Sequence, residues 1–423
     1  MSGQTPQPWG PQDRPQSQDE PQSGAPQSEG PQSPQPETGR PQDPGRMPPR
    51  FDVPEEQTYQ SDSGLWLMGQ PPEPPQGPQP GRPGHPGGGS DGRAGGASLF
   101  EAHRRFVLIG VGLCVVIAVW VGLGMVIGGL LDPYFPNGAP VWVTLAVSGV
   151  PLYCVAMPLS MLVFARVPVL KVRQFPLDVR RFLTMLAVCF PIMMAGNLIG
   201  SGLSKIISGG TATNRINDLI ANGDIWVNAL FMVLIAPFFE EWMFRRQLID
   251  RTRRYGERTS IALSAFAFAL FHMNLFQFFY AFGIGLVFGY VYMRTGRLRY
   301  SVAMHMILNA NGALVAPLVM SLAGDQTSRI AEGTMTEQEM MAAAQANPGI
   351  IGVLLYSFVL MAVAVGGVVL LARNWRAIEF YDPPERLPGW QGVRIAFLNP
   401  AMIVYTVLTI VLGLWQMGIL TFG

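Results

Sequence analysis

The stretch IWVNALFMVLIAPFFEEWMFRR, residues 225–246, ends a long apolar run with two glutamates and two arginines. About 20 helical residues cross a hydrocarbon core roughly 30 Å thick, so this run is long enough to span a bilayer. Ionisable side chains within a membrane helix are costly unless they face a partner or a wet cavity. The stretch therefore predicts a membrane helix whose charged residues have a function.

The composition also indicates a membrane protein. Of the 423 residues, 49% are hydrophobic and only 13% are charged, against roughly 25% charged residues in ordinary soluble domains. The net charge of +1 does not indicate a nucleic-acid partner, and we expect none. The three cysteines all lie within apolar runs, which does not fit a disulfide framework.

The N-terminal part of the chain has a different character. Residues 1–98 consist mainly of Pro, Gln, Gly, Ser and Asp, with too few large apolar side chains to offset the loss of chain entropy on folding. We expect a disordered tail that contains no secretory signal peptide. Its segment PPEPPQGPQP, residues 71–80, could bind an SH3-like or WW-like domain, but a solvated spacer explains it more simply. The sequence identifies no partner for the tail.

Residues 99–423 form the predicted transmembrane domain, an all-α polytopic helical bundle. The apolar runs lie at 106–130, 141–165, 182–206, 225–244, 260–275, 277–293, 300–322, 349–372 and 396–421. The fifth and sixth runs are short and nearly continuous, which predicts a tight hairpin. We therefore expect about nine membrane helices, with eight as the alternative.

The distribution of basic residues predicts the orientation. If the N-terminus is cytoplasmic, the cytoplasmic connections hold eighteen Lys and Arg residues and the opposite connections hold three. The eighteen lie within 166–181, 245–258, 294–299 and 373–394. Cytoplasmic loops carry an excess of Lys and Arg, so we expect an integral plasma-membrane protein with a cytoplasmic N-terminus. The bias towards arginine over lysine suggests a bacterial source.

The fourth predicted helix carries the first group of buried ionisable residues. Glu241 and Arg245 are four residues apart, so they share one helix face and can form an ion pair. Glu240 is rotated by about 100° from Glu241, so we expect the two glutamates to have separate roles. A structural ion pair explains Glu241 and Arg245 without any chemistry. Glu240 has no polar neighbour at helical spacing and must find one on another helix.

Two later helices carry polar residues at the same spacing. Phe268 and His272 are four residues apart, as are His305 and Asn309. These groups reach the depth of Glu240 only if the fourth helix continues past Arg245. A membrane histidine or asparagine is often a helix-packing hydrogen bonder, and Phe268 is explained by packing alone. The functional hypothesis therefore depends on the joint pattern.

A carboxylate, two imidazoles and a carboxamide that converge in an apolar site are what amide hydrolysis needs. Glu240 could accept a proton from water, His272 could orient that water, and the pair His305 and Asn309 could donate hydrogen bonds to the oxyanion. Alternatively, Glu240, His272 and His305 resemble a two-His, one-carboxylate zinc site. No HExxH motif is present, so the sequence leaves the question of a metal open.

The three patterns EExxxR, FxxxH and HxxxN occur in this order on separate apolar runs, and together they resemble the CAAX-protease and bacteriocin-processing family of intramembrane endopeptidases, also called the Abi family. The resemblance covers residues 180–322. It implies a helical bundle with a conical cavity that opens towards the cytoplasm and hydrolyses peptide bonds near the membrane.

By motif position, the resemblance implies a catalytic role for Glu240. It also implies that His272 assists water activation and that His305 and Asn309 stabilise the oxyanion, while Glu241 and Arg245 support them. The implied partners are the lipid bilayer and a membrane-embedded or membrane-associated peptide substrate. In a bacterium we expect peptide maturation, bacteriocin self-immunity or cleavage of membrane regulators rather than prenylated substrates.

A function of another class also fits the buried Glu and His residues. A non-enzymatic membrane scaffold or a transporter could use them as a structural network or a proton relay. Transporters commonly show inverted repeats with broken helices in matching positions, and no such repeat is evident in this sequence. The peptidase is therefore the leading hypothesis.

Overall fold

A computed structural model describes residues 57–61, 64–68, 93–326, 329–330, 333–383 and 385–420, with side chains from Leu99 onward apart from Asp325. The chain divides into the units Met1–Arg46 and Met47–Gly423, and the first unit lies outside the described residues. Most of the predicted disordered tail lies outside them as well, so that expectation stays a prediction.

The described chain is built almost entirely from helices. The first half contains α1 (Arg93–Leu131), α2 (Val141–Val150), η2 (Pro151–Ala156), α3 (Met157–Phe164), α4 (Val179–Ile207), α5 (Arg215–Asn222), α6 (Ile225–Asn228), η3 (Ala229–Ile235), α7 (Ala236–Glu241), η4 (Trp242–Ile249), α8 (Asp250–Thr252) and η5 (Arg253–Tyr255). The second half contains α9 (Glu257–Phe271), α10 (Leu275–Thr295), α11 (Leu298–Ala310), η6 (Asn311–Val315), α12 (Ala316–Ser321), α14 (Glu337–Ala346), α15 (Gly349–Asn374), α16 (Gly389–Phe397) and α17 (Pro400–Gln416).

Three short strands accompany the helices. Strand β1 (Gln57–Ser61) pairs antiparallel with β2 (Gly64–Met68) on one side and with β3 (Lys171–Val172) on the other. This small sheet does not alter the fold class, because all the long apolar segments are helical.

The predicted all-α membrane bundle is confirmed. Within the described residues, seven helices are long and apolar enough to cross a membrane, or eight if the pair α16 and α17, bent by 57°, counts as one span. They begin at Leu99, Val141, Val179, Ile225, Leu275, Leu298 and Gly349. The run predicted at 260–275 becomes α9, whose 15 residues are too short to be counted as a span.

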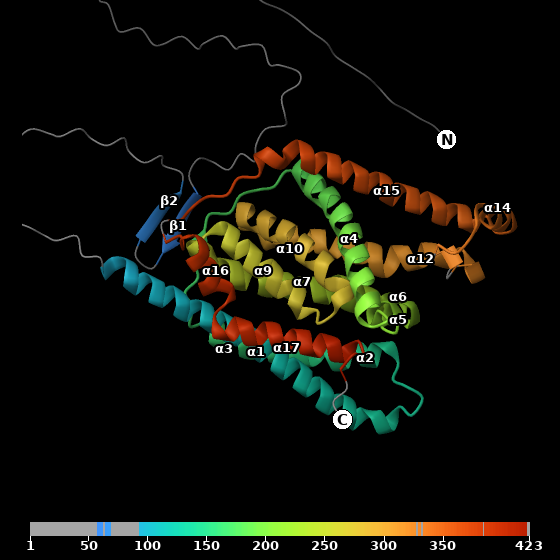
Figure 1. The fold of residues 1–423 in the computed structure, drawn as a ribbon, viewed down its shortest axis with the longest axis horizontal. Coiled ribbons are helices and arrows are strands. Elements are labelled where there is room, and N and C mark those ends of the chain that lie inside the picture. The colour runs from blue at the N-terminus through green and yellow to red at the C-terminus, as the bar shows by residue number, and fades with distance from the viewer. Residues whose placement is uncertain are drawn as a thin grey trace, which may run out of the picture. The chain divides into compact units, whose positions relative to one another are not determined.

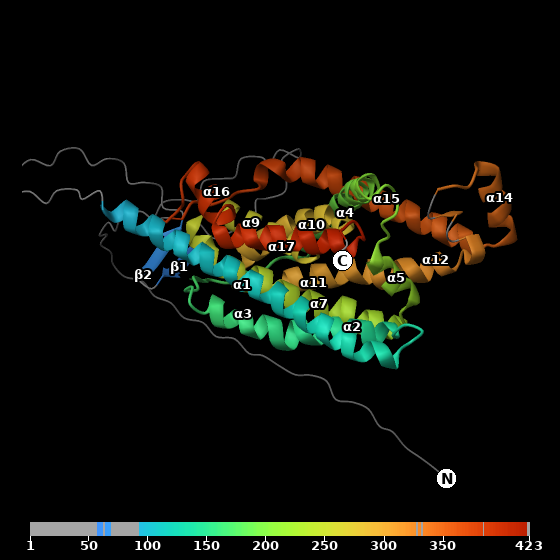
Figure 2. The same cartoon turned by 60° about the horizontal axis from the view of Figure 1, so that its bottom comes forward.

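Helices α9 and α10 occupy the middle of the bundle (Figure 1). They form the predicted tight hairpin, because α9 ends at Phe271 and α10 begins at Leu275. Figure 1 shows α4 and α15 along one side of this hairpin and α1 and α17 along the other. The turned view in Figure 2 shows α3 and α2 next to α1.

Helices α4 and α10 pack closely in an antiparallel arrangement. A Cβ atom at Gly196 would clash with the backbone of Tyr280, and one at Gly200 would lie 2.7 Å from the carbonyl oxygen of Leu275. In the reverse direction, a Cβ at Gly283 would clash with Ile192. Small residues let membrane helices approach closely, and here they fix the position of the first two turns of α10.

Candidate functional site

The helix that carries both glutamates continues well past the arginines. Residues Ile225–Tyr255 form one candidate span of 31 residues, so Glu240 lies at its middle, about 22 Å from each end. The three motifs can lie at the same depth in the membrane only if this helix continues past Arg245. The short α7 segment that ends at Glu241 lies between two π-helical segments, η3 and η4, and such segments are frequent at functional sites.

Glu241 and Arg245 form the expected ion pair. Arg245 Nε lies 3.1 Å from Glu241 Oε2, and both side chains are fully buried. The Arg245 guanidinium also lies over the rings of Phe268, 4.6 Å from the centroid, and Phe288, 5.5 Å away. An aromatic face attracts a cation through the ring quadrupole, so these rings supply part of the interaction that water would otherwise provide.

His305 connects the two glutamates, which the sequence did not predict. Its Nδ1 lies 3.1 Å from Glu241 Oε1, and its Nε2 lies 3.8 Å from Glu240 Oε2. Although the two carboxylates point about 100° apart on their own helix, an imidazole carries two nitrogens and approaches both from α11. The two carboxylates therefore lie near opposite nitrogens of one ring, and the expectation that they have separate roles stays a prediction.

His272 caps the C-terminus of α9. Its Nδ1 lies 2.8 Å from the carbonyl oxygen of Phe268, and since a carbonyl can only accept, Nδ1 carries the proton and Nε2 is left for other partners. The Phe268 ring contacts both histidine rings edge to face, with centroids 4.8 Å from His272 and 5.7 Å from His305. Phe268 thus separates the two imidazoles and holds them at one end of α9.

The turn after His272 is strained. Met273 has φ of 46°, a left-handed conformation that costs an L residue with a side chain about 1–2 kcal/mol. Residues held in such conformations cluster at functional sites. Here the turn ends α9 directly after His272 and starts α10 two residues later.

Asn309 contacts the backbone of the helix that carries the glutamates. Its Nδ2 donates to the carbonyl oxygen of Met232 at 2.8 Å, two helical turns before Glu240. In the π-helical segment a backbone N–H bonds the carbonyl five residues earlier. The residue five positions after Met232 is Pro237, which has no N–H to donate. The Asn309 carboxamide satisfies the acceptor that Pro237 leaves free and so ties α11 to η3.

The sequence did not indicate two half-buried tyrosines. Tyr153 lies in η2, and Tyr280 lies in α10, where its hydroxyl accepts from Gln277 Nε2 at 2.8 Å. The Tyr153 ring also stacks on Phe239, with centroids 4.8 Å apart. Neither tyrosine belongs to one of the three motifs, and the only sequence signal is the spacing of Tyr280 three residues after Gln277.

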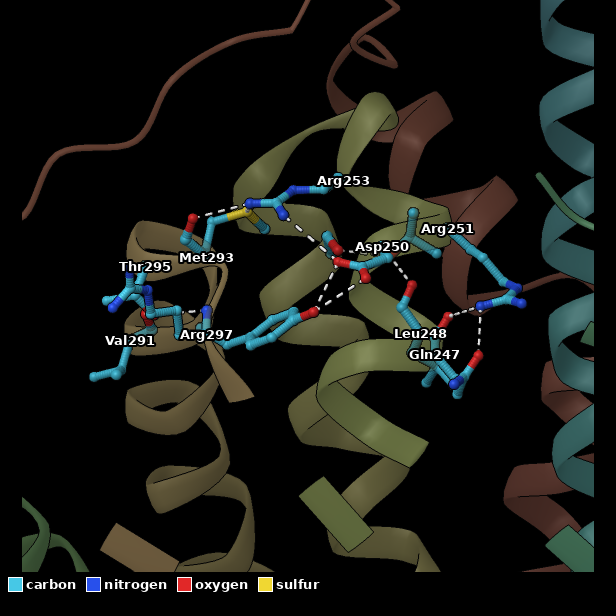
Figure 3. A network of polar contacts seen from close by, with 12 residues as sticks. Gln247, Leu248, Asp250, Arg251, Arg253, Val291, Met293, Thr295 and Arg297 are labelled. Carbon is cyan, nitrogen blue, oxygen red and sulfur yellow. Dashed lines mark hydrogen bonds and ion pairs between the residues drawn. The ribbon is translucent and has the colours of Figure 1, made fainter. Parts of the chain in front are cut away.

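Buried arginines fix the end of the helix that carries the glutamates (Figure 3). Arg253 donates to the carbonyl oxygen of Met293 at 2.9 Å and lies 3.6 Å from Asp250. The hydroxyl of Tyr292 donates to Asp250 at 3.0 Å, and Arg251 donates to the carbonyl oxygen of Phe164 at 2.9 Å. These contacts join the helix to α10 and α3, and so set the height of Glu240 relative to Tyr280.

The three side chains proposed for zinc do not fit a metal ion as they lie. Among the residues that the structure describes, no three His, Cys, Asp or Glu side chains are grouped so that they could hold one. We therefore derive no step through a metal.

Residues 222–311 match the family model described as Type II CAAX prenyl endopeptidase Rce1-like. The match includes the positions of all three motifs, from Glu240 to Asn309, so the resemblance to the CAAX-protease and bacteriocin-processing family is confirmed over this segment. It is narrower than the range 180–322 expected from the motifs. No curated protein and no solved structure matches the chain. The family match over this segment and the apolar helices both fit an integral membrane protein.

Proposed function

We propose that this protein is an intramembrane endopeptidase that hydrolyses peptide bonds of membrane-associated proteins or peptides, with Glu240 as the base that activates water. The observation that carries the proposal is the contact of one imidazole, His305, with two carboxylates of different environment. Glu241 is fully buried and paired, whereas the Glu240 side chain keeps 12% of its surface exposed. A carboxylate that is to receive a proton from water needs that access.

The tautomers of the two histidines follow from their partners. Glu241 pairs with Arg245 and therefore acts as an ionised acceptor, so His305 Nδ1 must donate to it. His305 Nε2 then points to Glu240, and His272 likewise has its Nε2 available. Each ring is thus oriented through Nδ1, which fixes the nitrogen that meets the reacting groups.

The proposed reaction needs only water as co-reactant. Glu240 accepts a proton from water while the water oxygen bonds to the scissile carbonyl carbon, which gives a tetrahedral intermediate with a negative oxygen. Glu240 then returns the proton to the amide nitrogen as the C–N bond breaks, releasing a carboxylic acid and an amine. His272 accepts a hydrogen bond from the water through Nε2 and so orients it, and the second N–H of Asn309 donates to the oxyanion. His305, whose Nδ1 donates to Glu241, also donates to the oxyanion through Nε2 when the ring is an imidazolium with a proton on both nitrogens.

The first test replaces the base. Glu240→Gln keeps the shape of the side chain but removes its ability to accept a proton, so we expect a loss of cleavage of about 10²–10⁴-fold. Protein termini in membranes from cells that express the wild type or the variant at matched levels are mapped by mass spectrometry. Asp218→Asn, which changes an exposed carboxylate of α5, is the matched control and should cleave like the wild type.

Termini that occur with the wild type and the control, but not with Glu240→Gln, would support the proposal and name the substrates. If all three proteins gave the same termini while the wild type still changed the phenotype of the cells, the buried Glu and His residues would instead serve a scaffold or a transporter.

A further inference from the structure

The aromatic ring of Phe288 lies against the imidazole of His305. The two ring centroids are 5.4 Å apart, and the ring planes are tilted by 36°. Phe288 belongs to α10 and is fully buried, so its ring has no surface on which a substrate could lie. None of the three sequence motifs includes Phe288, and the proposed reaction assigns it no step.

One hydrogen bond holds the imidazole of His305. Its Nδ1 donates to Glu241 Oε1 at 3.1 Å, whereas its Nε2 lies 3.8 Å from Glu240 Oε2, which is beyond hydrogen-bond distance. A hydrogen bond tolerates a departure from linearity of about 30°, so the bond at Nδ1 leaves the ring some freedom to tilt. The direction of Nε2 therefore depends on the side chains packed against the imidazole.

Two phenylalanines restrict this tilt. The ring of Phe268 is perpendicular to that of His305, at 89° with centroids 5.7 Å apart, whereas the ring of Phe288 is closer to parallel. Because the interior is close-packed, the imidazole cannot tilt far without moving into one of the two rings. Phe288 thus supplies the second of two contacts that differ in direction.

Phe288 also contacts the other partner of Glu241. The guanidinium carbon of Arg245 lies 5.5 Å from the centroid of the Phe288 ring, and Arg245 and His305 bond to different oxygens of the Glu241 carboxylate. An aromatic face attracts a cation. One buried ring therefore lies against both groups that bond this carboxylate, and it holds the three polar side chains together.

Close packing of α10 on α9 brings Phe288 to this place. A Cβ atom at Gly285, three residues before Phe288, would lie 3.1 Å from Ala265 and 3.4 Å from the ring of Phe268. Glycine therefore lets α10 approach the part of α9 that carries Phe268. Residues three apart lie on one helix face, so Phe288 points to the same side as this contact.

We propose that Phe288 is a positioning residue, which acts on catalysis through His305 by holding the plane of the imidazole so that Nε2 faces Glu240 and the reacting groups. This assignment rests on the proposed peptidase activity. Because Phe288 acts behind the imidazole and does not touch the substrate, its loss should slow turnover and leave substrate binding unchanged.

The test uses the full chain in liposomes and a synthetic peptide that spans a cleavage site found in the mapping of termini. Phe288→Met keeps an apolar side chain that fills irregular space but removes the flat ring. It should lower kcat by about 10–100-fold, because a displacement of about 1 Å can cost about 100-fold in rate. KM should change by less than about threefold, since no contact with the substrate is lost. Phe288→Tyr keeps the ring and should restore kcat to within about fivefold of the wild type.

Two further comparisons separate positioning from packing. Phe106→Met removes another fully buried ring, which contacts Tyr255 at 5.4 Å, so it should lower the melting temperature as Phe288→Met does and leave kcat unchanged. In a His305→Ala background, Phe288→Met should cause no further loss of kcat, because a residue that acts through the imidazole has no effect once the imidazole is gone.

The outcomes distinguish this assignment from the proposed function. Cleavage by the wild type together with an unchanged kcat for Phe288→Met would overturn the role of Phe288 and leave the peptidase standing. An equal loss of kcat for Phe106→Met, a folded Phe288→Tyr as slow as Phe288→Met, or an undiminished further loss in the His305→Ala background would overturn it as well. If the wild type and Asp218→Asn cleave nothing, the proposed function fails and this assignment fails with it. Size-exclusion chromatography identifies variants that do not fold, and Phe288→Leu takes the place of Phe288→Met if that variant is one of them.

Discussion

At the scale of single residues, the site depends on one buried carboxylate, Glu241, which lies between an imidazole and a guanidinium. Glu241 accepts from His305 on one side and pairs with Arg245 on the other. Arg245 is fully buried over two aromatic rings, so its charge depends on Glu241 for compensation. The pair thus orients the ring that faces Glu240, which gives Glu241 a positioning role.

This dependence predicts a coupled loss of stability. Arg245→Met should destabilise the protein by about 3–5 kcal/mol, because it leaves the buried Glu241 charge uncompensated. Adding Glu241→Leu should recover most of that loss, since no buried charge then remains, although activity should stay low because His305 has lost its partner. Melting temperatures in detergent measure both effects. A double variant that melts no higher than Arg245→Met would contradict the coupling.

At the scale of elements, two features shape the site. The π-helical segments on either side of α7 present carbonyl groups to other helices, as the bond from Asn309 to Met232 and that from Ser264 to the carbonyl oxygen of Phe244 at 2.7 Å show. The close packing of α4 on α10 then fixes Gln277 and Tyr280. The position of the site is therefore set by contacts between helices rather than within one.

The α4–α10 contact can be tested with two glycines of the same helix. Gly196→Leu places a side chain against the Tyr280 backbone and should lower both the melting temperature and the cleavage activity, the latter by more than tenfold. Nothing lies within 4 Å of a Cβ at Gly202, so Gly202→Leu should be close to the wild type in both measurements. Equal effects of the two substitutions would show that the contact is not specific.

At the scale of the whole membrane domain, the hairpin of α9 and α10 places the basic residues that flank it at one end of the bundle. Since α9 and α10 run in opposite directions, the basic residues before α9 and after α10 lie at the same end, and Arg253 contacts Met293 there. Buried at that end is also the ion pair between Arg294 and Glu257. The expected orientation requires only that α10 ends on the side where α9 begins. It does not depend on whether α9 itself crosses the bilayer.

The orientation predicts which loops are accessible from outside the cell. In a chain whose three cysteines are replaced by Ala, Thr211→Cys should react with a membrane-impermeant maleimide in intact cells, and Arg376→Cys should react only after the cells are opened. Both positions are exposed. The reverse labelling pattern would show that the N-terminus lies outside, against the excess of Lys and Arg in the connections assigned to the cytoplasm.

The sequence by itself determined the membrane bundle and the motif residues. Runs of about 20 apolar residues have no stable alternative to membrane helices, and this local property needs no tertiary information. The pairing of Glu241 with Arg245 was also predictable, because helical spacing alone places the two side chains together.

Only the tertiary structure decided how the motifs meet. That His305 contacts both glutamates and that Asn309 serves the carbonyl freed by Pro237 both depend on the rotation and height of neighbouring helices. Those quantities are set by glycine contacts and buried arginines, such as Gly196 and Arg253, whose partners lie 84 and 40 residues away in the chain. Periodicity within one helix contains no information about such partners, so the site became visible only after the helices were packed.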